Sequence, residues 1–94
     1  SDNINIPSSH RIKNVFPNPF NPSVNIEFEI EKLSDISFIF YDILGKQVDK
    51  INYGYAQAGI HSISWRPNLP AGTYFIGMFD SKKNISNKKV TLIK

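Results

Sequence analysis

The amino-acid sequence predicts an all-β fold, and three observations lead to this prediction. Residues 24–31 alternate apolar and polar side chains without a break, a period of two that is typical of a strand with one buried and one wet face. Turn signals built from glycine, proline, asparagine and aspartate then recur at intervals of roughly 8–12 residues. No stretch combines the apolar spacing of a helix with capping residues. The sequence therefore predicts an antiparallel β-sandwich in a single domain.

The chain begins with a polar segment, residues 1–14, that has no sustained period. We expect this segment to be a loosely ordered linker to a domain over residues 15–94. A proline-rich run follows, formed by Pro17, Asn18, Pro19, Phe20, Asn21 and Pro22. Proline has no N–H to donate to a ladder and biases the residue before it toward extended geometry. We expect this run to be a rigid, extended segment at an edge of the fold.

Five more strands are expected after the alternating one. Their expected bounds are residues 36–41, 47–53, 60–65, 73–79 and 88–93. Between the first two of these, Asp42 and Gly45 occupy the first and fourth positions of an expected type I turn. Loops or turns are expected at residues 54–59, 66–72 and 80–87. Six strands and the proline-rich edge predict an immunoglobulin-like sandwich of about seven strands, in preference to a closed barrel.

Length and composition restrict the class of protein. At 94 residues the chain is long enough for one modest core, and without cysteine it has no disulfide and no thiolate metal site. The net charge of +3 comes from scattered lysines, unlike the clustered pattern of a nucleic-acid-binding surface. No apolar run approaches the ~20 residues that cross a bilayer. The chain opens at Ser1 without an initiator methionine, so we expect it to be a piece of a longer protein.

The residue types that usually carry chemistry form no recognisable site. His10 and His61 have no second nitrogen ligand at a metal-binding spacing. Glu27, Glu29 and Glu31 line the wet face of one strand, where carboxylates serve solubility and deter edge pairing. There is no Gly-x-Ser-x-Gly elbow and no phosphate-binding glycine loop. We therefore expect no catalytic residue, no cofactor site and no metal site, and hence no enzyme.

Exposed side chains leave two alternatives open. The first alternative is that four aromatic residues form a platform that binds sugar rings, namely Trp65, Tyr53, Tyr55 and Phe75. Trp65 shares its strand face with Ile63, so we expect it in the core, whereas Tyr55 falls in an expected loop and should be exposed. Contact with an acidic partner is the second alternative, for the two lysine pairs that bracket the last hairpin, Lys82-Lys83 and Lys88-Lys89, where we expect a solvated turn.

Several motifs together resemble one family. They are the proline run, a strand–turn–strand signature, a Gly-x-His-x-hydrophobic-x-Trp strand, a Leu-x-x-Gly-x-Tyr-Phe segment and a terminal Lys-Lys-hydrophobic strand. Apart from the proline run and the terminal strand, the residues that carry them are Tyr41, Asp42, Gly45, Trp65, Gly72 and Tyr74. Over residues 15–94 the chain resembles the type A C-terminal sorting domains of type IX (Por) secretion, which are related to the immunoglobulin-like domain of flagellar hook-capping proteins. One departure is Arg66-Pro67, where the family usually has Asp or Asn followed by Gly.

The resemblance implies a non-catalytic transport signal in a Gram-negative bacterium. A cargo domain N-terminal to it would reach the periplasm and then cross the outer membrane through the type IX translocon, to be secreted or held at the cell surface. A sortase-like surface peptidase would cut within the linker. The resemblance implies candidate translocon-recognition residues in the terminal strand, namely Lys88, Lys89, Val90, Leu92 and Lys94. The alternative is an accessory immunoglobulin-like, carbohydrate-binding or spacer module of a secreted hydrolase, which rests on the fold and on exposed aromatics such as Tyr55.

Overall fold

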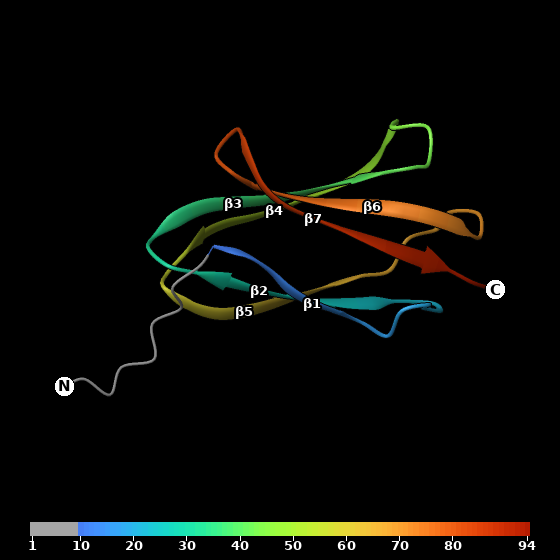
Figure 1. Cartoon of the computed structure of the whole chain (residues 1–94), viewed down its shortest axis with the longest axis horizontal. Coiled ribbons are helices and arrows are strands. Elements are labelled where there is room, and N and C mark those ends of the chain that lie inside the picture. The colour runs from blue at the N-terminus through green and yellow to red at the C-terminus, as the bar shows by residue number, and fades with distance from the viewer. Residues whose placement is uncertain (1–9) are drawn as a thin grey trace.

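The structure is a computed structural model that describes residues 10–94, and these residues form two packed antiparallel sheets (Figure 1). The strands are β1 (Arg11–Phe16), β2 (Val24–Ile30), β3 (Ser34–Tyr41), β4 (Gln47–Ala56), β5 (Gly59–Trp65), β6 (Gly72–Asp80) and β7 (Lys83–Leu92). One sheet has the order β1-β2-β5 and the other β4-β3-β6-β7. The predicted immunoglobulin-like sandwich of about seven strands is confirmed. The fourth strand, β4, belongs to the larger sheet. No helix in the described residues could span a membrane.

The core lies between the two sheets and follows the period of two in the sequence. Strand β2 buries every second residue along its length, beginning at Val24 and ending at Ile30. Strand β3 does the same from the opposite sheet, so that Phe28 and Phe38 meet edge to face with ring centroids 4.9 Å apart. Full burial of each such side chain is worth about 1.5–3 kcal/mol. The sandwich is therefore held by apolar packing, as expected for a chain without cysteine.

Trp65 is the largest side chain in this core and is only 2% exposed. Its indole stacks on Phe40 at a centroid distance of 4.0 Å, with an interplanar angle of 16°. The indole Nε1 donates to Asp49 Oδ2 of β4 at 2.8 Å, so the buried donor has a partner. The expectation that Trp65 lies in the core is confirmed, and the contact joins the ends of the two sheets.

His61 lies at the rim of the sandwich, on the same face of β5 as Trp65. Its Nε2 donates to the Gln57 carbonyl at 2.7 Å, because a carbonyl oxygen can only accept. With the proton on Nε2, Nδ1 accepts from the Tyr53 hydroxyl, 3.2 Å away on β4. The ring also stacks on Phe28 at 5.5 Å. These contacts give His61 a structural role in closing one open side of the sandwich.

The loop between β5 and β6 ends in a tyrosine corner. Tyr74 is buried near the start of β6, and its hydroxyl donates to the Pro70 carbonyl at 2.6 Å, four residues upstream. A tyrosine at this corner that bonds back to upstream backbone is a hallmark of immunoglobulin-like sandwiches. The Leu-x-x-Gly-x-Tyr motif therefore shapes a turn of the scaffold.

Tyr74→Phe removes only this hydrogen bond and keeps the ring. We expect the free energy of unfolding to fall by about 1 kcal/mol, the usual net value of one such bond, measured by urea denaturation with an unchanged m value. Tyr55→Phe is the matched control, because the Tyr55 side chain is 76% exposed. A loss as large as that of a core truncation, or no loss at all, would contradict this account of the corner.

Three strands extend further than the sequence indicated. Strand β1 begins at Arg11 and buries Ile12, so Arg11, Ile12 and Asn14 of the expected linker pair with β2, and Lys13 lies in a bulge between them. Residues 1–9 of the expected linker lie outside the described part. Strand β4 continues as far as Ala56, into the loop expected at residues 54–59, because a bulge at Tyr53 and the positive φ of Gly54, 94°, let the ladder continue. Strand β7 begins at Lys83 after a short turn, whereas a turn was expected at residues 80–87.

Candidate recognition surface

The proline run lies along the outer edge of β7 and is bent where an extended segment was expected. Its only ladder contact among the described residues is a parallel bridge between Phe20 and Leu92. Phe20 N donates to Thr91 O at 2.8 Å, and Ile93 N donates to Phe20 O at 3.0 Å. Proline cannot supply the alternating N–H groups of a longer ladder, which accounts for the single bridge.

The Asn18 side chain continues this pairing in place of backbone. Its Oδ1 accepts from Thr91 N at 3.1 Å, and its Nδ2 donates to Lys89 O at 3.2 Å. A carboxamide carries the same donor and acceptor as a peptide group, so it can satisfy an exposed strand edge. Phe20, two residues further on, is fully buried, with its ring centroid 5.9 Å from that of Trp65. The first and last motifs of the sequence therefore form one structural unit.

The β3–β4 turn is a second rigid feature. Asp42 Oδ1 accepts from Leu44 N and from Lys46 N, both at 2.9 Å, and Gly45 N donates to Asp42 O at 3.0 Å. Gly45 has a φ of 83°, which a residue with a side chain rarely adopts. At the tip, Ile43 and Leu44 are 70% and 89% exposed. The tyrosine–aspartate–glycine signature thus builds a stiff turn that presents apolar side chains to solvent.

The terminal strand divides the candidate recognition residues into two groups. Lys88, Lys89 and Lys94 are exposed, whereas Val90 and Leu92 lie in the core at 0% and 2% exposure. Alternation along β7 accounts for Lys89, because its neighbour Val90 points into the core. Lys88 has the same phase as Val90 and is the register partner of the buried Ile76, but it is exposed on β7, the edge strand of the larger sheet. In the folded domain, a partner can reach the three lysines but not the two aliphatic side chains.

Exposed apolar groups lie on the outer face of the larger sheet beside these lysines. Side chains alternate between the two faces of the sheet along β6 and β7, and this alternation places Phe75, Lys89 and Ile93 on the outer face. Phe75 is the direct cross-strand partner of Lys89. Phe75 is 38% exposed and Ile93 is 48% exposed. We call these three residues the terminal patch. Sequence reasoning missed it, although the position of Phe75 between two residues expected to be buried was a usable signal.

The other residues considered from sequence do not converge on a reaction centre. Glu27 accepts from Asn14 Nδ2 at 3.0 Å, and Glu29 pairs with Arg11 at 3.4 Å. Strand β2, which carries them, is the centre of its sheet, so an edge-protecting role is wrong for them. His10 accepts from Glu31 N at Nδ1 and lies 3.3 Å from Asp80 through Nε2. Residues 10–94 contain no group of three side chains able to hold a metal ion.

The alternative of an aromatic platform is not supported, because Trp65 lies in the core, as expected. Tyr53 is 36% exposed and bonded to His61, whereas Tyr55 is 76% exposed as expected. Lys82 and Lys83 are both exposed near the β6–β7 turn. These side chains are spread over different faces, so they supply no single site for a sugar ring stacked on several aromatics.

Fold and surface together define an immunoglobulin-like β-sandwich module whose motifs build a rigid scaffold and leave its exterior for contacts with other macromolecules. A family model for the secretion system C-terminal sorting domain matches residues 14–93, nearly the whole chain, and the chain belongs to this family. No curated protein gave a match.

Membership of this family assigns the function. The domain is a sorting signal for type IX secretion, which exports its chain across the outer membrane to a secreted or cell-surface location. It is attached to cargo in the same chain and recognised by the type IX system. The family is one of sorting signals, which favours a non-enzymatic role.

Proposed function

We propose that the type IX translocon recognises the folded sandwich through the terminal patch, with Lys88 and Lys94 at its border. The observation that carries this proposal is the division within the terminal motif, where the two aliphatic residues are buried in the core, the three lysines are exposed, and Lys89 lies beside Phe75 on the outer face. A partner therefore meets a preformed surface of fixed geometry, which lowers the ordering cost of binding.

The position of this surface supports the proposal. Strand β1 begins at one end of the sandwich, and the C-terminus lies at the other (Figure 1). Cargo attached ahead of β1 is therefore joined to the domain at the end opposite its C-terminus. A surface at the C-terminal end can therefore bind a membrane-embedded partner at a site separate from the point where the cargo is attached.

We propose that the sortase-like peptidase cuts the chain before Arg11. Arg11, Ile12 and Asn14 are register partners of β2 residues, so the strand would have to leave the sheet to enter a protease site. Just ahead of the strand, His10 accepts a hydrogen bond from Glu31 N and lies 3.3 Å from Asp80. The linker proposed at residues 1–14 therefore offers its cleavable bonds ahead of these contacts.

Export of a reporter fused ahead of the chain tests the recognition surface. In a type IX-competent bacterium, Lys88→Ala with Lys89→Ala should lower the exported fraction at least tenfold, measured in the medium and on the cell surface. Both side chains are exposed, so we expect thermal unfolding to move little.

Lys82→Ala with Lys83→Ala is the matched control, because it removes the same charge from the same hairpin. We expect this pair to be exported normally. If the control pair blocks export while the Lys88 and Lys89 pair does not, the recognition surface lies at the β6–β7 turn, and the terminal patch is excluded.

A further inference from the structure

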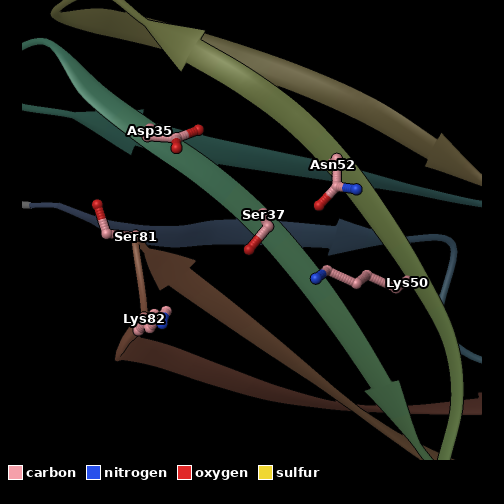
Figure 2. A pocket seen from close by; sticks show the side chains of 6 residues that line it. All are labelled: Asp35, Ser37, Lys50, Asn52, Ser81 and Lys82. Carbon is pink, nitrogen blue, oxygen red and sulfur yellow. The ribbon is translucent and has the colours of Figure 1, made fainter.

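A polar groove crosses the outer face of the larger sheet, away from the terminal patch. It has a volume of about 310 Å³ and is lined by Asp35, Ser37, Lys50, Asn52, Ser81 and Lys82. Strand β3 forms the floor, β4 one wall, and the β6–β7 turn the other, as Figure 2 shows. The turn is fixed to the floor by Ser81 N, which donates to Asp35 O at 2.8 Å.

The side chains of this groove point to a ligand rich in hydroxyl groups. Two serine hydroxyls and the Asn52 amide can both donate and accept, and the Asp35 carboxylate accepts only. Among residues 10–94, no side chain in the lining has a hydrogen-bond partner, so this part of the chain leaves their polar atoms available. Alternating donors and acceptors of this kind match the neighbouring hydroxyls of a sugar ring.

Two further features narrow the class of sugar. Lys50 reaches from β4 toward the floor of the groove and Lys82 stands on the opposite side, against the single carboxylate of Asp35 (Figure 2). The excess of positive charge favours a ligand that carries an anionic group. Tyr55 is the cross-strand partner of Asp35 and is 76% exposed, so its ring is free to pack on the apolar face of a sugar.

We propose that this groove binds an acidic saccharide: Asp35, Ser37 and Asn52 take the ring hydroxyls, and Lys50 and Lys82 take the carboxylate. An acidic peptide fits less well, because it offers few hydroxyls to Asp35, Ser37 and Asn52. The proposal is independent of sorting, since none of these residues belongs to the terminal patch.

Titration of the chain with tetragalacturonate, followed by NMR, tests the proposal. We expect saturable shifts at Ser37, Asn52 and Ser81, and a dissociation constant that rises with ionic strength. Fully methyl-esterified tetragalacturonate keeps the rings and hydroxyls without the charge, and it should bind at least tenfold more weakly. Tetraglutamate carries similar charge without the rings and should also bind at least tenfold more weakly.

Substitutions in and outside the groove test whether tetragalacturonate binds there. Lys50→Ala with Lys82→Ala, and separately Tyr55→Ala, should each weaken tetragalacturonate binding at least tenfold. Lys13→Ala with Lys32→Ala removes two exposed lysines outside the groove and should leave binding unchanged. Equal binding of tetraglutamate, equal loss in both lysine pairs, or no shift at the groove would each overturn the proposal.

Discussion

Trp65→Ala is expected to lower the free energy of unfolding by about 3–5 kcal/mol, the range for truncating a large buried aromatic. The indole stacks on Phe40 and also contacts the rings of Phe20 and Tyr74, so its loss leaves a cavity that borders several elements. A domain of this size has a total stability of about 5–14 kcal/mol. Urea denaturation should show a large fall in the midpoint, and export of fused cargo should fall with it.

Two variants separate the causes of this loss. Trp65→Phe keeps most of the apolar volume but leaves Asp49 Oδ2 without its donor, so it should cost less than the alanine variant. Tyr55→Ala removes an aromatic ring that is 76% exposed and should leave the midpoint nearly unchanged. An alanine variant at Trp65 as stable as the original chain would mean that the core does not depend on this side chain.

The strands that could be predicted are those in which one face is buried along the whole length. In β2 every second residue is in the core, so the period of two is complete and visible in the sequence. Strand β1 was missed because a bulge between Ile12 and Asn14 interrupts its alternation and leaves one buried apolar residue among polar ones. The first half of β7 was missed for a related reason, since its residues pair through the backbone and bury little.

The recognition surface could be predicted only in part. The terminal motif was located from sequence, but its division into buried and exposed residues depends on the phase of β7 against the opposite sheet. The role of Asn18 could not be predicted, because its partners Lys89 and Thr91 lie more than 70 positions away in the chain. A side chain that substitutes for a strand has no local signal. Only the tertiary structure shows that the proline run and the last strand support each other.

This mutual support determines what a truncation of the last strand does. Removing residues 89–94 takes Val90 and Leu92 out of the core, where each contributes about 1.5–3 kcal/mol. It also removes the groups that Asn18 and Phe20 bond to, and it uncovers the buried Phe20 ring. We expect the truncated chain to lose its cooperative unfolding transition, observed by circular dichroism and urea denaturation, and to lose export as well.

Loss of export in that truncation therefore reports the loss of the fold, and it cannot by itself locate the recognition surface. Asn18→Ala provides a graded test of the same coupling, because it breaks two hydrogen bonds to β7 and leaves the core intact. We expect it to cost about 1–3 kcal/mol, with export retained where the folded fraction is retained. A truncated chain that still unfolds cooperatively, with Asn18→Ala as stable as the original, would show that β7 and the proline run are independent. In that case the sandwich would fold without residues 89–94, and the terminal strand would serve recognition alone.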